Sequence, residues 1–172
     1  YCAAERYRLF LLNSVLGGGL SSRLFRKLRE ERGLVYGISS ELHAYRDAGV
    51  LVIEGSTAPE HLTSVVALTI MELQQLATFE TAIDEEELWT AKMQLRSQQL
   101  LSAENAHTRM SRLATQELYF GRHLPEAEIL AEIGQITAED LWQTCRLRLL
   151  PAVGQLALSV VGPEAAQWYS QE

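Results

Sequence analysis

A glycine cluster, a basic stretch and a tyrosine-bearing run follow one another between Leu16 and Ser40. The chain reads LGGGLSSRLFRKLREERGLVYGISS there. Three successive glycines end the apolar stripe before them, because glycine is the residue that most often closes a helix. Ser21 or Ser22 is a suitable N-cap for a second helix, and Gly33 ends that helix before an alternating pattern begins. The segment therefore predicts a helix, a tight turn, a short basic helix and a strand.

Arg29 and Tyr36 are the residues of this segment with the clearest capacity to bind a ligand. Arg29 lies near the end of the basic helix, and Tyr36 opens the strand seven positions later. A guanidinium and a phenol can both donate hydrogen bonds to a carbonyl oxygen or an oxyanion. On residue chemistry alone, structural roles fit too, with Arg29 bonding helix-terminal carbonyls and Tyr36 packing on the core. Arg26, Lys27 and Arg32 are interpreted as a solvated helix face.

The pattern along the rest of the chain predicts helices around one hairpin. Expected elements are strands at 34–45 and 50–53, helices at about 59–77 and 85–120, a bend in the second near 103–106, a capped helix from 137, and a buried strand at 155–161. In the first strand, alternation places Tyr36 on the side of Ile38 and Ser40, with Val35 on the other side. This order predicts an α+β fold, a two-layer sandwich with helices on one face of a mainly antiparallel sheet.

Composition fits one globular domain spanning residues 1–172. The 172 residues suffice for a sizeable core. The net charge of −7 disfavours a nucleic-acid-binding surface, and no apolar run approaches the roughly 20 residues of a membrane span. Cys2 and Cys145 lack a CxxC spacing and are expected to act as small apolar residues. The two cysteines do not decide between a reducing compartment such as the cytoplasm and an oxidising one such as the periplasm.

No metal or nucleophile motif is present in the sequence. The four histidines, at positions 43, 61, 107 and 123, form neither HExxH nor the inverted HxxEH, so we expect no zinc site within these residues. The glycine cluster lacks the lysine and serine of a phosphate-binding loop, which favours a tight turn between helices. A flexible glycine turn beside a substrate cleft is the alternative. No G-x-S-x-G elbow surrounds the serines near the turn.

Matched blocks along nearly the whole chain resemble the second, non-zinc domain of the pitrilysin/insulinase family of zinc peptidases, in its mitochondrial-processing-peptidase-like group. The blocks are, in order, the glycine turn, Ser22-Arg23-Leu24-Phe25, Arg29-Glu30, Arg32-Gly33-Leu34, Tyr36, Gly49, Glu87-Leu88, Ala91-Lys92, Arg109-Met110, Gly121-Arg122, Thr137-Ala138-Glu139-Asp140 and Val161-Gly162-Pro163. So many blocks in one order are more specific than any single motif.

The resemblance implies a role for Arg29 and Tyr36. Members of that family consist of paired, similar α/β domains that form a chamber around the substrate. The first domain carries the inverted zinc motif. A later domain supplies an arginine and a tyrosine, at the spacing of Arg29 and Tyr36, which bind the substrate backbone near the scissile bond. Family domains also have a strand ahead of the first helix here, so the resemblance implies a fragment of a longer chain whose first strand is missing.

Two classes of function follow from the resemblance. In the first, residues 1–172 form the substrate-binding domain of a zinc metalloendopeptidase, inactive by itself. Its partners are then a peptide substrate and a zinc-bearing domain or subunit of the same family. In the second, the chain belongs to a non-proteolytic scaffold related to the core proteins of a respiratory complex. The presence of both Arg29 and Tyr36 favours the first class.

Overall fold

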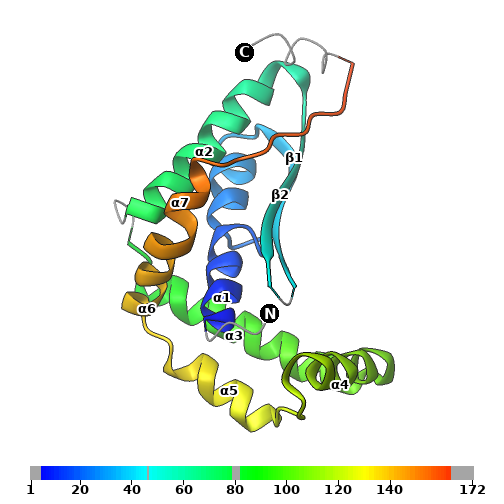
Figure 1. The fold of residues 1–172 in the computed structure, drawn as a ribbon. Coiled ribbons are helices and arrows are strands. Elements are labelled where there is room, and N and C mark those ends of the chain that lie inside the picture. Colours follow the sequence, from blue (N-terminus) through cyan, green and yellow to red (C-terminus); the bar gives the residue numbers. More distant parts are fainter. Residues whose placement is uncertain (1–4, 46, 79–81, 164–172) are drawn as a thin grey trace.

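The computed structural model describes residues 5–45, 47–78 and 82–163 as helices around one β-hairpin (Figure 1). The elements are α1 (Arg6–Leu16), η1 (Phe25–Glu30), β1 (Val35–Ala44), β2 (Gly49–Thr57), η2 (Pro59–His61), α2 (Leu62–Thr78), α3 (Glu85–Glu104), α4 (Ala106–Phe120), α5 (Glu126–Gln135), α6 (Ala138–Thr144), η3 (Cys145–Leu149) and α7 (Leu150–Val153). Of the short turns, η1 and η3 are π-helical and η2 is 3₁₀.

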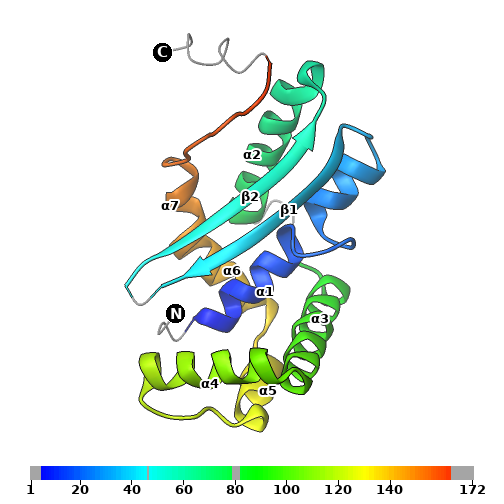
Figure 2. The same ribbon diagram turned by 90° about the vertical axis from the view of Figure 1, so that its right-hand side faces the viewer.

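The hairpin forms one layer, and α1, α2 and α7 lie on one side of it, while α4 projects beyond its lower end (Figure 1). β1 and β2 pair antiparallel, with Ser40 opposite Ile53 and Leu42 opposite Leu51. Figure 2 shows the hairpin crossing the front of the molecule, with α1 and α2 behind it. This arrangement confirms the predicted α+β class, with helices on one face of an antiparallel sheet. The extent of α5 was not anticipated from the sequence.

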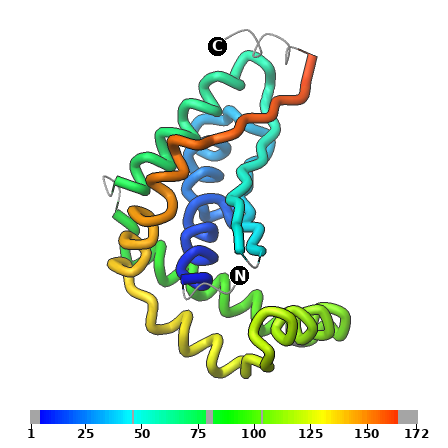
Figure 3. The backbone as a smooth tube through the Cα atoms, in the orientation of Figure 1, coloured from blue at the N-terminus to red at the C-terminus, as the bar shows by residue number. Residues whose placement is uncertain are grey.

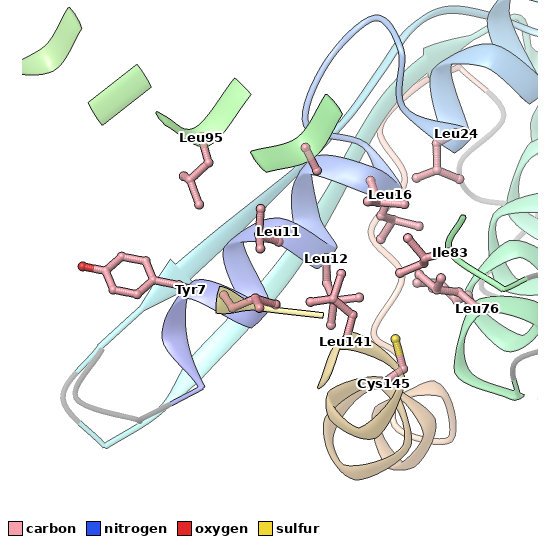
Figure 4. Packing of buried hydrophobic residues seen from close by; sticks show 14 of the residues in the cluster. Tyr7, Leu11, Leu12, Leu16, Leu24, Leu76, Ile83, Leu95, Leu141 and Cys145 are labelled. Carbon is pink, nitrogen blue, oxygen red and sulfur yellow. The ribbon is translucent and has the colours of Figure 1, made fainter. Parts of the chain in front are cut away.

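The core lies between α1, the inner face of β1 and the last helices. Leu11, Leu16 and Leu141 are among the fully buried side chains there (Figure 4). On β1 the inner residues are buried, whereas Leu51 and Ile53 on β2 are only half-buried. In the described part of the chain, the helices therefore cover the inner side chains of β1 more completely than those of β2.

The helix that was expected at 85–120 breaks as predicted. α3 ends at Glu104, and Asn105 begins α4 by accepting a hydrogen bond from the Thr108 amide at 3.0 Å. The predicted capping box at Thr137 is also confirmed, since the Thr137 and Asp140 side chains each accept from the other's backbone amide. Short side chains that bond the first-turn amides define helix starts in this way.

The predicted capping role of Ser21 or Ser22 is wrong. No side chain caps the start of the second helix, and the buried Ser22 hydroxyl has no hydrogen-bond partner within the described residues. Instead the Ser22 carbonyl accepts the Arg26 amide at 3.0 Å. The glycine turn and the side-chain anchors of this helix, described below, define where it starts.

The predicted buried strand at 155–161 is also wrong. This segment is extended but unpaired, and Leu156, Leu158 and Val161 are exposed. The tube in Figure 3 shows it leaving α7 and crossing α2. In Figure 2 it runs beside the hairpin on the β2 side, with α2 visible between them. An apolar run becomes a strand only where a neighbour pairs with its backbone, and the described sheet has only β1 and β2.

None of the described helices is both long and apolar enough to cross a lipid bilayer.

Candidate functional site

The glycine turn after α1 is pressed against the middle of β1. The Ser40 amide donates to the Gly17 carbonyl at 2.9 Å, and a Cβ on Gly17 would lie only 2.7 Å from the Ser40 nitrogen. The Ser40 hydroxyl also donates to the Asn13 carbonyl at 3.3 Å. Only glycine allows this approach, so the sequence at this turn fixes the end of α1 against β1.

The start of the second helix is anchored by Arg23, which is only 4% exposed. Its guanidinium donates to both carboxylate oxygens of Glu87 on α3, at 2.8 and 2.7 Å, and to the Ala82 carbonyl at 2.8 Å. Burial lowers the pKa of Arg23, but the hydrogen bonds and charges of Glu87 and Glu72 outweigh this and raise it. Arg23 therefore stays charged and joins this helix to α3.

Glu72 on α2 provides the second anchor of the same helix. It is 1% exposed, and its carboxylate is paired with Lys27 and lies 3.6 Å from the Arg23 guanidinium. The interpretation of Lys27 as part of a solvated face is therefore wrong, whereas Arg26 and Arg32 are exposed as expected. Arg23 and Lys27, two residues before and two residues after Phe25, thus attach the start of this helix to α2 and α3.

Arg29 lies on the last turn of this anchored helix and points away from the core. Its side chain is exposed, and no hydrogen bond or ion pair joins it to another residue in the described ranges. Gly33, with a φ of +62°, then turns the chain toward β1. The expectation that Arg29 could bond helix-terminal carbonyls is therefore not met, and its guanidinium is available to a ligand.

Tyr36 lies on the opposite side of β1 from that predicted by simple alternation. The register shifts between Val35 and Gly37, so Tyr36 is the extra residue of a β-bulge. Val35 and Ile38 are both buried as a result, while Tyr36 is 73% exposed. A bulge bends the strand locally and changes the direction of a side chain at the extra residue. Tyr36 therefore does not pack on the core, and its hydroxyl has no partner within the described residues.

The structure places Arg29 and Tyr36 on neighbouring elements at one end of the hairpin. η1 packs against β1, and the Leu34 amide bonds back to the Leu28 carbonyl at 2.9 Å. Figure 2 shows this light-blue helix beside the start of β1. The two side chains do not bond each other. Both are exposed donors on rigid, anchored backbone.

A hollow of about 650 Å³ extends from this end of the hairpin along its surface. It lies between the glycine turn and both strands. One of its lining residues, Gly37, directly follows Tyr36 in the chain. Its lining consists of Gly17, Gly18, Gly19, Leu20, Phe25, Gly37, Ile38, Ser39, Ser40, Glu54, Gly55 and Ser56. Neither Arg29 nor Tyr36 lines it. Sequence reasoning left open a cleft beside the glycine turn but did not predict that β2 lines it, because β2 reaches the hollow only through the strand pairing.

The described residues do not contain a group of three or more His, Cys, Asp or Glu side chains that could hold a metal ion. The His123 imidazole, for example, lies 2.9 Å from the Gln116 side-chain oxygen. Burial raises the pKa of the Cys145 thiol to about 12, so this cysteine remains protonated and inert. Cys2 lies outside the described residues.

The sequence model of the peptidase M16 inactive domain matches residues 1–95. The chain belongs to the peptidase M16 family. Its resemblance to the non-zinc domain of these zinc peptidases is thereby confirmed. It is 36% identical over 163 residues to an uncharacterized zinc protease of Mycobacterium tuberculosis, covering 95% of this chain and 36% of that protein. An uncharacterized zinc protease of Bacillus subtilis is 39% identical over 134 residues, covering 77% and 32%.

Solved structures share the fold of this M16 domain. A conserved protein from Enterococcus faecalis superposes with a TM-score of 0.76 at 24% identity, over 85% of this chain and 33% of that one. The peptidase M16 inactive domain from Pseudomonas fluorescens gives 0.70 at 22% identity, over 84% and 34%. A chain of complex III2 from Candida albicans gives 0.70 at 18% identity, over 84% and 36%. The M16 chain spans about a third of the length of the curated relatives it matches.

We expect the 172-residue chain by itself to bind no stoichiometric zinc and to cleave no peptide. Two imidazoles must share one site to hold catalytic zinc, and the sequence has no such histidine spacing. Metal analysis after dialysis and a fluorogenic peptide assay test both statements. One tightly held zinc per chain would contradict the first.

Proposed function

We propose that this M16 domain is the substrate-binding, non-catalytic domain of a zinc metalloendopeptidase. Arg29 and Tyr36 contact the substrate backbone beside a zinc ion that another domain or subunit carries. The observation that carries this proposal is the exposure of two hydrogen-bond donors on neighbouring elements, neither of which has a partner within the described residues. A bulge directs Tyr36 outward, and the Arg23 and Lys27 anchors hold the helix of Arg29.

The chemistry of the two side chains suits that role. The guanidinium is permanently charged, and the phenol donates one hydrogen bond; both can bond a peptide carbonyl oxygen. Their bonds strengthen as negative charge develops on that oxygen during hydrolysis. The described residues offer no ligand set for zinc, whereas the curated relatives are named zinc proteases. The metal therefore belongs, in this proposal, to a partner domain or subunit of the same family.

Steady-state hydrolysis of peptides by the complete protein tests this function. The proposal requires zinc-dependent cleavage that depends on Arg29 and Tyr36. A complete protein that assembles with partners but hydrolyses no peptide would support the scaffold alternative instead. The fold shared with the Candida albicans chain fits both functions, because a likeness at 18% identity concerns the fold alone.

We also propose that these 172 residues are a C-terminal-type domain of a longer chain, in which a further strand completes the sheet along β2. Three observations support an unpaired edge of β2 that can accept another strand. The Ser40 amide bonds Gly17 rather than β2, so its partner Ile53 directs its own amide to the free edge. Leu51 and Ile53 are half-buried. The exposed apolar segment 156–161 runs on the β2 side without a partner.

Leu158→Glu is expected to destabilise the complete protein but not the 172-residue chain. Leu158 is 57% exposed here and becomes buried if an added strand pairs with its segment. Losing a buried leucine lowers the free energy of unfolding by about 2 kcal/mol or more. Leu118→Glu is the control, since Leu118 is 81% exposed and belongs to α4, outside the hairpin and the segment 156–161. Thermal unfolding of both lengths tests this, and equal effects of Leu158→Glu on both would contradict the added strand.

A further inference from the structure

The bulge that exposes Tyr36 lies at the very start of the strand ladder. The first pair of the hairpin is Val35 opposite Thr57, and the next is Gly37 opposite Ser56. After Gly37 the pairing continues without a further shift to the end of β1. Before Tyr36 there is a single ladder pair, and one pair at a strand end contributes little to the register, because strand ends fray. The position of the bulge therefore needs support on this side.

The Thr57 side chain provides a bond on this side of the bulge. Its hydroxyl donates to the Leu34 carbonyl at 2.5 Å, whereas the Ala58 carbonyl lies farther away, at 3.4 Å. A hydroxyl has one proton to donate, so the nearer oxygen of Leu34 is its acceptor. This bond is partly buried, which strengthens it against competition from water. The side chain thus extends the contact between the two strands one residue beyond the first ladder pair.

Both backbone polar groups of Leu34 are held as a result. Its amide donates to the carbonyl of Leu28 in η1 at 2.9 Å, and its carbonyl accepts the Thr57 hydroxyl. The Leu34 side chain also packs against the buried core. Leu34 therefore joins three elements, which are the helix of Arg29, the start of β1 and the end of β2. Tyr36 follows two residues after this junction.

We propose that Thr57 is a positioning residue for Tyr36, because its hydroxyl holds the bulge where it directs the phenol outward. This inference rests on the proposed function, since it takes the Tyr36 phenol as a donor to the peptide substrate. Successive strand residues point to opposite faces, so a bulge displaced by one residue would turn the phenol to the other side of β1. Even a misplacement of about 1 Å in a binding group can reduce the rate by about 10²-fold.

Hydrolysis of a fluorogenic peptide by the complete protein tests this role. Thr57→Val nearly preserves the shape of the side chain but removes the hydroxyl, and we expect it to lower kcat/KM by about tenfold or more. Thr57→Ser keeps the hydroxyl and should retain most of the activity. Thr69→Val is the matched control, because the Thr69 hydroxyl donates in the same way to the Val65 carbonyl, at 2.8 Å within α2. It should retain nearly full activity.

A double-mutant cycle with Tyr36→Phe separates positioning from a general loss of structure. If Thr57 acts through the Tyr36 hydroxyl, Thr57→Val should change kcat/KM by less than about twofold once that hydroxyl is absent. A general loss of structure would instead lower the activity equally in both backgrounds. Hydrogen exchange of the complete protein provides a readout besides activity. Thr57→Val should accelerate exchange at residues 34–38, and Thr69→Val should not.

The outcomes distinguish this inference from the proposed function. If Tyr36→Phe lowers kcat/KM but Thr57→Val retains full activity, or lowers it equally in both backgrounds, the inference is wrong and the proposed function stands. Unchanged hydrogen exchange at residues 34–38 in Thr57→Val would also overturn the inference. If Tyr36→Phe itself has no effect on kcat/KM, the proposed function and the inference fail together.

Discussion

Arg29→Ala is expected to lower kcat/KM for peptide hydrolysis by the complete protein by about 10²–10³-fold. Tyr36→Phe, which removes only the hydroxyl, should have an effect of the same kind. Each change removes one donor to an oxygen on which negative charge develops, and loss of one such donor typically costs about 2.7–4 kcal/mol of transition-state stabilisation. The measurement is steady-state hydrolysis of a fluorogenic peptide with wild-type and variant proteins.

Thermal unfolding of the same variants separates function from structure. Both side chains are exposed and make no bond within the described residues, so the melting temperature should hardly change. Arg32→Ala is the control, because Arg32 is exposed on the same basic stretch yet has no assigned role. It should retain nearly full activity. Full activity of Arg29→Ala with a sharply lowered melting temperature would mean that Arg29 is structural, and the scaffold alternative would then be preferred.

Local patterns in the sequence were sufficient to predict most of the fold. The hairpin, the break near Asn105 and the capping box at Thr137 each depend on residues within a few positions of one another. Glycines and short polar side chains determine such features almost by themselves. The same local logic correctly predicted a turn at the glycine cluster, where Gly17 leaves no room for a Cβ beside Ser40.

Predictions failed where a distant partner determines the outcome. Alternation placed Tyr36 on the same side of the strand as Ile38 and Ser40, but the bulge that separates them depends on how β2 pairs with the start of β1. The run at 155–161 has the composition of a buried strand, yet burial requires a neighbouring strand that the described sheet lacks. Periodicity reports what a segment prefers, whereas pairing with another segment decides its register and burial.

The anchors of the second helix were also missed, although the sequence contains a signal for them. Glu72 falls on the buried stripe of α2 together with Val65, Leu73 and Leu76. A carboxylate on an apolar stripe requires a cation, because an unpaired buried charge is very costly. The nearby basic stretch supplies Arg23 for that purpose. Looking for a partner of Glu72 would also have removed Lys27 from the residues assigned to the solvated helix face.

Arg23→Met is expected to destabilise the 172-residue chain by about 3–5 kcal/mol, because removing one member of a buried ion pair leaves the other uncompensated. Among the described residues, Glu72, with its side chain 2% exposed, would then keep Lys27 as its one cationic partner, and Glu87 would lose two hydrogen bonds. For a domain of this size, about 2–4 °C per kcal/mol predicts a fall in melting temperature of about 6–20 °C. Thermal and urea unfolding measure both quantities.

Two further variants show whether the loss comes from the buried charges. Arg122→Ala removes a cation from an exposed pair with Glu128 and should change the melting temperature little. Arg23→Lys keeps the positive charge but loses the planar guanidinium, whose two N–H groups bond both Glu87 carboxylate oxygens. The stability of this variant should therefore lie between those of the wild type and Arg23→Met. If Arg23→Met were as stable as Arg122→Ala, the anchor would be dispensable. Loss of the Arg23 side chain should also weaken the attachment of the helix that carries Arg29, because Arg23 and Lys27 bind that helix to α2 and α3.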